Sequence, residues 1–398
     1  MKDLIRHLSV SAVVAGLIAT LISYAGPLVI VFQAAQGAGL PDSMVSSWIW
    51  AISIGSGVLG IVLSLRYKVP IIIAWSAPGS ALLVTLLPHV TLNEAIGAYL
   101  VSGLIIFLVG VSGAFDRIVG KLPPAISAAM LAGILFSFGT QLFVSLQAKP
   151  VLVLAMLIAY LLGRRLAPRY AVALVLVVGC MTAIAAGDLH ASSLVTGLAT
   201  PQWISPAFSL HAILNIALPL VVVALTGQFV PGIAVLRNDG YQTPARPLLA
   251  SSALGTLLLA PFGCHGLTLS AITAAICTGR EAHEDPSRRY VAGVAGGVAY
   301  LLLGLFGATL VSLFSAFPHE LIAALAGLAL LGAIGGALSG AMGSPQDREA
   351  ALITFLVTAS GMSFLGLSAA FWGLIVGLFA HLVLAVRKAR RSEVSVAG

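Results

Sequence analysis

The stretch Val69-Pro70-Ile71-Ile72-Ile73-Ala74-Trp75, followed by Ser76-Ala77-Pro78-Gly79-Ser80, decides how this chain folds. Its first part is rich in β-branched residues, which favour extended backbone. Its second part is typical of a helix start, with Ser76 or Ala77 as the N-cap and Pro78 in the first turn. A similar stretch, Ala260-Pro261-Phe262-Gly263-Cys264-His265-Gly266-Leu267-Thr268-Leu269-Ser270, lies in the other half of the chain. Each stretch predicts a short extended segment followed by a half-helix.

The composition around these stretches indicates a membrane protein. Of the 398 residues, 59% are hydrophobic and 8% are charged, against roughly 25% charged in soluble domains. The apolar runs are continuous instead of alternating, which argues against a transmembrane β-barrel and for an all-α integral membrane protein surrounded by lipid. The basic residues are scattered between these runs, as topology signals are, so no nucleic-acid partner is expected.

Charged, polar and Pro-rich punctuation divides the chain into about fourteen apolar segments, judged against the roughly 20 residues that cross a bilayer. The N-terminal run MKDLIRHLSVSAVVAGLIATLISYAG resembles a signal peptide. Its apolar part is too long and lacks a convincing cleavage site, so it is expected to be the first span. All but Lys149 of the 20 Lys and Arg residues fall on alternate loops. We therefore predict a multi-pass protein of the inner (cytoplasmic) membrane with both termini cytoplasmic.

Seven spans in each half would place the second half upside down relative to the first, as in an inverted repeat. We predict a first repeat over residues 1–190, an extracytoplasmic, partly helical link over 191–211, and a second repeat over 212–398. The broken stretches are then spans 3 and 10. Extended backbone at membrane depth is tolerated where it is buried in protein or lines a cavity, and paired broken spans point to a transporter's central site. Ordinary Pro/Gly kinks in packed helices are the alternative.

The half-helix N-termini favour an anion. Neither stretch from Pro78 to Ala81 nor from Gly266 to Ser270 contains Lys or Arg, so recognition falls to backbone N–H groups and to polar side chains beside an apolar wall. An aromatic or otherwise apolar monocarboxylate fits such a site better than sulfate or phosphate. The candidate substrate-binding residues are Tyr24, Trp75, Ser76, Pro78, Gly79, Ser80, Gln228, Phe229, Phe262, Gly263, His265, Gly266 and Thr268.

The roles of three candidates stay open. All 13 acidic residues map to loops, tails or span ends, which leaves His265 as the plausible titrating group of the broken segments. His265 either carries the coupling proton as imidazolium, is a neutral hydrogen-bond donor, or is structural. Gln228 binds a substrate carboxyl or ties span 8 to the broken spans, and Tyr24 donates to the carboxylate or to a neighbouring helix.

The sequence favours neither an enzyme nor a cofactor protein. An integral-membrane enzyme needs His, Asp or Glu clustered within the spans, and none is present. The three cysteines have no metal-ligand spacing, so no metal is expected.

Residues 70–82, Gly227-Gln228 and Pro261-Phe262-Gly263-Cys264-His265-Gly266 resemble the benzoate transporter (BenE) family of benzoate:proton symporters, over essentially the whole chain. The resemblance implies a fold similar to uracil permeases and sulfate-type anion exchangers. It implies a core domain (spans 1–4 and 8–11), a gate domain (spans 5–7 and 12–14), and a substrate between half-helices 3 and 10. It further implies benzoate import with protons by alternating access, and a homodimer by analogy with the fold relatives.

One departure from the fold relatives bears on the substrate. Nucleobase permeases place acidic residues on spans 8 and 10, where this chain has Gln228 and the neutral stretch around His265. The absence of those charges suits an anionic substrate, because a carboxylate beside a carboxylate is repelled. A nucleobase permease of the same fold and a passive small-anion channel are the alternatives.

Overall fold

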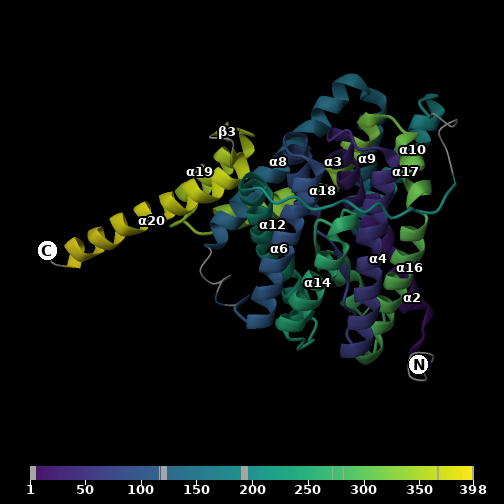
Figure 1. Ribbon diagram of the computed structural model, residues 1–398, viewed down its shortest axis with the longest axis horizontal. Helices are drawn as coiled ribbons and strands as arrows, with labels where there is room; N and C mark the ends of the chain where they lie inside the picture. Colours follow the sequence, from purple (N-terminus) through teal and green to yellow (C-terminus); the bar gives the residue numbers. More distant parts are fainter. Residues whose placement is uncertain are drawn as a thin grey trace.

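The computed structural model describes residues 6–115, 117, 123–189, 196–270, 272–280, 282–364 and 367–396. Lys2 and Lys121, which contributed to the topology prediction, and part of the predicted link lie outside these ranges. The described chain is a bundle of apolar helices with two short pairs of strands (Figure 1).

The described residues of the first half form eight α-helices, one buried strand and two short 3-10 turns. In order they are α2 (Val10–Ala25), α3 (Pro27–Gly37), α4 (Asp42–Tyr67), β1 (Ile73–Trp75), α5 (Ala77–Leu86), η1 (Leu87–His89), α6 (Leu92–Ser112), α8 (Pro124–Ala148), α9 (Pro150–Leu166), η2 (Pro168–Tyr170) and α10 (Ala171–Ala185).

The second half is more broken. It contains α11 (Leu210–Ala212), η4 (Ile213–Ala217), α12 (Leu218–Ala224), η5 (Leu225–Phe229), α13 (Val230–Asn238), α14 (Ala245–Leu259), η6 (Ala260–Phe262), β2 (Leu267–Leu269), α15 (Ile272–Thr278), η7 (Pro286–Arg288), α16 (Tyr290–Leu305), α17 (Gly307–Ser315), α18 (His319–Met342), α19 (Arg348–Ala359), β3 (Ser363–Phe364), β4 (Leu367–Ser368) and α20 (Ala369–Val396).

Within the described ranges, seven helical runs are long and apolar enough to cross a membrane, and the bent pair of α16 and α17 brings the number up to eight. The other expected spans correspond to helices that are short or broken, among them α5, α10 and α15. The mostly helical membrane architecture is therefore confirmed, and the count of about fourteen spans stays a prediction.

The chain bends by 70° between α16 and α17. At the bend the Leu305 carbonyl accepts a hydrogen bond from the Ala199 N–H at 2.8 Å. Gly304 and Gly307 lie so close to α4 that a Cβ would be 2.6 Å from the Ser53 side chain and 3.1 Å from the Ser46 carbonyl oxygen. An external partner and close packing together account for the break.

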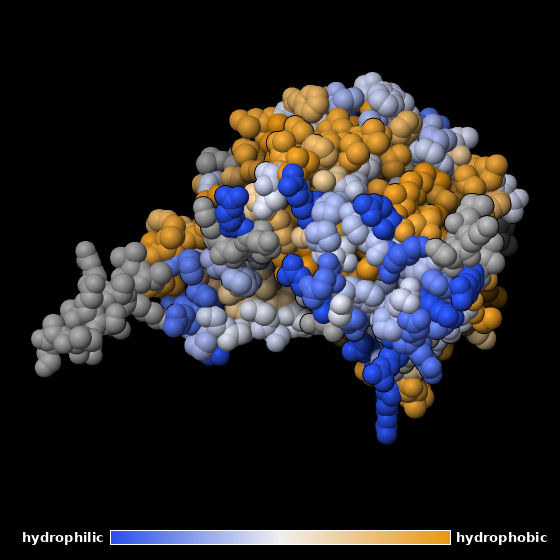
Figure 2. Space-filling view, turned by 90° about the horizontal axis from the view of Figure 1, so that it is seen from below, coloured by the Kyte–Doolittle hydropathy of each residue, from blue (hydrophilic) through white to orange (hydrophobic). Residues whose placement is uncertain are grey.

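The helices pack in two groups. In one group α4 packs on α16, α16 on α2, α6 on α14, and α3 on α5. In the other, α8 packs on α18, α19 and α20, and α10 packs on α9 and α18. In Figure 1 the helices α2, α4 and α16 lie at one end of the molecule and α19 and α20 at the other. Figure 2 shows hydrophilic residues gathered on the face seen from below and hydrophobic residues along its margins, as expected for a body that lies in a bilayer.

The described part of the link, residues 196–209, contains no helix, so the helical part that we expected is confined to Leu210 and His211 at the start of α11. This segment runs over the ends of the first helix group. Its backbone N–H groups at Ile204 and Ala207 donate to the carbonyls of Pro261 and Asn93, at 2.8 and 2.9 Å. These bonds to helix ends replace the internal bonds that a helix would make.

Candidate functional site

The two extended stretches cross inside the helix bundle. β1 and β2 pair antiparallel, with Ala74 opposite Thr268 and Trp75 opposite Leu267, and both strands are buried along their whole length. The Thr268 hydroxyl also donates to the Ala74 carbonyl at 3.3 Å. The pairing satisfies backbone groups that lipid does not hydrogen-bond. Both predicted extended segments are thus present, each followed by a short helix. The second helix, α15, begins after the stretch from Gly266 to Ser270, where we expected the half-helix to start; that stretch is extended because it pairs with β1.

The half-helix α5 begins at Ser76. The Ser76 hydroxyl accepts the Gly79 N–H at 3.0 Å, with Pro78 in the first turn, so Ser76 and not Ala77 is the N-cap. The Ser76 N–H donates to the carbonyl of Gly266 at 3.3 Å. The start of α5 is therefore attached directly to the segment that precedes β2.

A buried side-chain pair strengthens this attachment. Ser80 Oγ lies 2.8 Å from His265 Nε2 and 3.0 Å from the Ser76 carbonyl oxygen, and His265 is 2% exposed. Because a serine hydroxyl has one hydrogen, His265 donates through Nε2 whenever Ser80 donates to Ser76. In this geometry His265 holds the two broken segments together.

Aromatic rings cover the other side of β1. The Trp75 ring meets the edges or faces of Tyr24 and Tyr300, with centroids 5.5 and 5.8 Å away. The Tyr24 hydroxyl lies 2.5 Å from Ser53 Oγ of α4, so bonding to a neighbouring helix is the role that this conformation displays. Trp75 Nε1 is buried without a hydrogen-bond partner among the described residues. Trp75 therefore offers a free N–H donor beside the crossing.

Gln228 lies in a π-helical turn. The turn η5 (Leu225–Phe229) interrupts the long helical run that includes α12 and α13, and single π-turns inside α-helices occur frequently at functional sites. The turn packs between β2 and α8: a Cβ on Gly227 would lie 3.5 Å from the Leu131 side chain of α8. Phe229 is fully buried, whereas the half-buried Gln228 side chain makes no hydrogen bond to a described residue. Gln228 thus has a free amide between the crossing and α8.

Two predicted residues turn away from the crossing. The Phe262 ring contacts the rings of Trp50 and Trp203, at centroid distances of 5.7 and 5.5 Å. Gly263 has φ +98° and lies against the Trp48 indole. Six candidate residues therefore lie around the crossing: Trp75, Ser76, Ser80, His265, Gly266 and Thr268. Tyr24 contacts this group through the Trp75 ring. Phe262 and Gly263 lie under the link instead.

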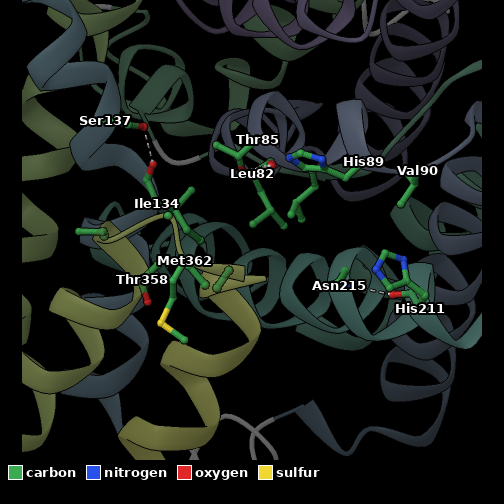
Figure 3. A pocket seen from close by; sticks show the side chains of 16 residues that line it. Leu82, Thr85, His89, Val90, Ile134, Ser137, His211, Asn215, Thr358 and Met362 are labelled. Atoms are coloured by element: carbon green, nitrogen blue, oxygen red, sulfur yellow. Dashed lines mark hydrogen bonds between the residues drawn. The ribbon is translucent and has the colours of Figure 1, made fainter. Parts of the chain in front are cut away.

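A cavity of about 260 Å³ lies farther along α5 and contains none of the thirteen candidate residues. Figure 3 shows Leu82, Thr85 and His89 on one wall, Ile134 and Ser137 of α8 on the next, and Asn215 and His211 opposite (Figure 3). The remaining wall is made by the end of α19 and the start of α20, with Thr358, Met362, Ala369 and Ala370. The cavity therefore lies between the two helix groups, and no acidic side chain lines it.

Sequence reasoning missed this cavity, although it left signals. Thr85 and Asn215 are polar residues within apolar segments, and Asn215 is 3% exposed. Asn215 lies in η4, the second π-helical turn of the same run. The two π-helical turns of this helical run therefore lie at the two features: η4 at this cavity and η5 beside the crossing.

A bundle of apolar helices in which two buried extended segments cross, each followed by a short helix, is typical of a membrane transporter. Residues 6–383 match the family described as benzoate membrane transport protein (BenE), and the chain belongs to that family. The family is one of transporters and not of enzymes.

Two curated relatives cover nearly the whole chain. The benzoate membrane transport protein of Acinetobacter baylyi is 50% identical over 389 residues, which are 98% of this chain and 99% of the relative. The inner membrane protein YdcO of Escherichia coli is 44% identical over 370 residues, 93% of this chain and 95% of that one. The relatives agree with a location in a membrane.

Two solved structures show the same fold at low sequence identity. The transmembrane domain of the cyanobacterial bicarbonate transporter BicA has a TM-score of 0.56 at 14% identity, over 95% of this chain and 98% of that one. The murine solute carrier 26 family member A9 anion transporter, in its inward-facing state, has a TM-score of 0.59 at 14% identity. The match covers 96% of this chain and 69% of that one. The likeness concerns the fold.

Proposed function

We propose that this protein imports benzoate or a closely related aromatic monocarboxylate across the inner membrane, together with protons. The observation that carries the proposal is the mixed lining of the cavity beside α5, which contains apolar and polar side chains and no acidic one. Leu82, Ile134 and Met362 provide apolar surface for a ring, and the imidazoles of His89 and His211 provide N–H groups that can donate to a carboxylate. A carboxylate that leaves water needs such donors, and a neighbouring Asp or Glu would repel it.

We place the substrate contacts beyond the cavity, at the N-terminal end of α5. Trp75 Nε1 and the Gln228 amide have no hydrogen-bond partner among the described residues. Trp75 directly precedes the N-cap of α5, and the turn with Gln228 packs on β2. A carboxylate that reaches the crossing would accept from these donors, and the positive end of α5 would stabilise its charge. The other candidate residues of this region, around Ser76 and His265, would shape the site by holding the two segments together.

Alternating access completes the proposal. The grouping of α8, α9, α10, α18, α19 and α20 supports a gate domain, and the grouping of α2 to α6 with α11 to α17 supports a core domain. The cavity at their boundary supports a substrate route between them. We further propose the inverted repeats over residues 1–190 and 212–398, about fourteen spans and cytoplasmic termini, as for related carriers with broken helices. An elevator shift and a rocking motion both fit this division, and the homodimer stays a prediction.

Two proton routes are compatible with the geometry. The proton binds His265, which must then reorganise its bond to Ser80, or it travels on the substrate's own carboxyl group. Replacing His265 by Gln keeps a hydrogen-bonding side chain and removes the titration. Uptake that still follows the proton gradient in this variant assigns the proton to the substrate.

The experiment is uptake of labelled benzoate into proteoliposomes with and without an inward proton gradient, with uracil as competitor. We expect saturable accumulation that uracil does not reduce, and a drop of about tenfold in Gln228→Ala, the effect of losing about 1.4 kcal/mol of binding. Gln36→Ala, an exposed glutamine at the end of α3, is the matched control and should transport like the wild type.

Three results would overturn the proposal. Competition by uracil would indicate a nucleobase permease, and non-saturable flux that ignores the proton gradient would indicate a channel. Equal uptake by the Gln228→Ala and wild-type proteins would remove Gln228 from the site.

A further inference from the structure

A second cavity lies on the outside of the bundle, along the contact between α2 and α16. It has a volume of about 490 Å³, and its lining is almost entirely apolar. Leu17 and Leu21 of α2 and Val298 and Leu302 of α16 line it and are 42 to 57% exposed. Figure 1 shows the two helices side by side near the N-terminal end of the chain. We call this feature the α2/α16 groove.

Close backbone packing creates the groove. A Cβ on Gly16 would lie about 2 Å from the Ala292 carbonyl oxygen, so the helices touch there without side chains between them. The Thr20 hydroxyl donates to the Gly296 carbonyl at 3.1 Å across the same contact. Small residues that let helix backbones meet are typical of membrane bundles. The larger side chains on either side of the contact then form the walls of a groove.

The groove has the length of an acyl chain. Its lining extends on the α2 side from Leu8 to Leu21, roughly 20 Å at 1.5 Å per residue. One leaflet of the hydrocarbon core is about 15 Å deep. A lipid tail that lies along the helices therefore fits the groove from the membrane surface inward.

One end of the groove is basic. Lys68 Nζ lies 4.5 Å from the centroid of the Tyr290 ring, and the Tyr290 hydroxyl lies 3.3 Å from His7 Nδ1. His7 and Tyr290 directly precede Leu8 and Val291, which line the groove. Lys68 is exposed and forms no ion pair with a described residue. A free cation, an imidazole and a phenol thus meet where the apolar lining ends.

We propose that the α2/α16 groove binds one anionic phospholipid, with an acyl chain in the groove and the phosphate at Lys68 and His7, which the buried Tyr290 side chain contacts. Charge complementarity selects this occupant, because basic side chains beside membrane helices attract anionic headgroups. The lipid bridges α2, the end of α4 and the start of α16, three elements of the proposed core. Its binding therefore stabilises their packing.

The test compares lipids and variants of the purified full chain. In detergent micelles, phosphatidylglycerol should raise the melting temperature more than phosphatidylcholine, and native mass spectrometry should show one retained phosphatidylglycerol. Lys68→Gly suits the left-handed backbone at this position (φ 54°) and should weaken retention about tenfold, whereas Lys68→Arg should keep it. Val298→Trp should also reduce retention by filling the groove. Arg246→Gln, an exposed basic residue on another helix, is the matched control and should bind like the wild type.

Glycerol 3-phosphate carries the phosphate of the headgroup without an acyl chain, so it tests the headgroup alone. It should not stabilise the protein. Stabilisation by glycerol 3-phosphate equal to that by phosphatidylglycerol would overturn the lipid assignment. Equal retention of phosphatidylglycerol by Lys68→Gly and Val298→Trp would overturn the site. Neither result affects the benzoate proposal, which rests on a different cavity.

Discussion

Replacing Gly263 by Ala should be among the most destabilising small substitutions in this chain. Gly263 ends η6 with φ +98°, in the region that side chains other than glycine rarely occupy. A Cβ built on it would overlap the Trp48 indole, with 2.0 Å to Nε1 and 2.4 Å to Cγ. Trp48 is 0% exposed, so its ring has no solvent to move into. Both the backbone and the packing therefore oppose the new methyl group.

The magnitude has two separable parts. The left-handed backbone costs about 1–2 kcal/mol for a residue with a Cβ, and overpacking a filled core costs about 1–3 kcal/mol. Gly240 separates them, because its φ of +89° is nearly the same and nothing lies within 4 Å of its would-be Cβ. We expect a loss of about 1–2 kcal/mol for Gly240→Ala and about 2–5 kcal/mol for Gly263→Ala.

The assay is the free energy of unfolding in mixed detergent micelles, measured in a double-mutant cycle with Trp48→Ala. Trp48→Ala is itself destabilising because it leaves a cavity. In that background Gly263→Ala should cost only the backbone part, which gives a coupling of about 1–3 kcal/mol between the two positions. A coupling near zero, or equal losses for Gly263→Ala and Gly240→Ala, would refute the steric reasoning.

Two further predictions concern buried hydrogen bonds. Tyr24→Phe leaves Ser53 Oγ unpaired and should lower the unfolding free energy by about 1–3 kcal/mol. The double variant Tyr24→Phe/Ser53→Ala should recover this stability. Unchanged stability of Tyr24→Phe together with lost benzoate uptake would instead place Tyr24 in the substrate site. Arg289, 5% exposed, donates to three carbonyls of the segment before α16, two of them at 2.6 Å. Because lysine lacks the planar guanidinium group that makes these three bonds, Arg289→Lys should lower the unfolding free energy by about 3 kcal/mol. The control variant Arg280→Lys, at an exposed position, should not change it. Equal stability of the two variants would contradict the role of the guanidinium group.

The broken segments were predictable because their signals are local. A run of β-branched residues ahead of Trp75 favours extended backbone wherever it occurs, and a serine two residues before a proline caps a helix by its own geometry. Both features need only a few neighbouring residues, and both are present in the structure. The pairing of β1 with β2 also follows, since extended backbone in lipid needs a backbone partner.

Side-chain directions were less predictable because distant residues determine them. The Phe262 ring lies with Trp50 and Trp203, which precede it by 212 and 59 residues in the sequence. The cavity beside α5 is lined by Thr85, Ile134, Asn215 and Met362, which come from four separate elements. Polar residues within apolar segments are the one local signal of such a meeting point, and the π-turn around Asn215 becomes visible only in the folded backbone.

The hydrogen bonds at the crossing restrict where the proposed alternating-access motion would occur. Ser76 to Gly266, Ser80 to His265 and Thr268 to Ala74 join the two broken segments through backbone and buried side chains. Separating them would expose several polar groups to an apolar interior, each at a cost of about 1–3 kcal/mol. The turn that contains Gln228 faces the apolar Leu131 side chain of α8 on the side away from β2. The cavity beside α5 already separates α5 from parts of α8. Apolar surfaces slide past one another without breaking hydrogen bonds, so the boundary with α8 is where the two groups of helices should move, and the crossing should move as one unit.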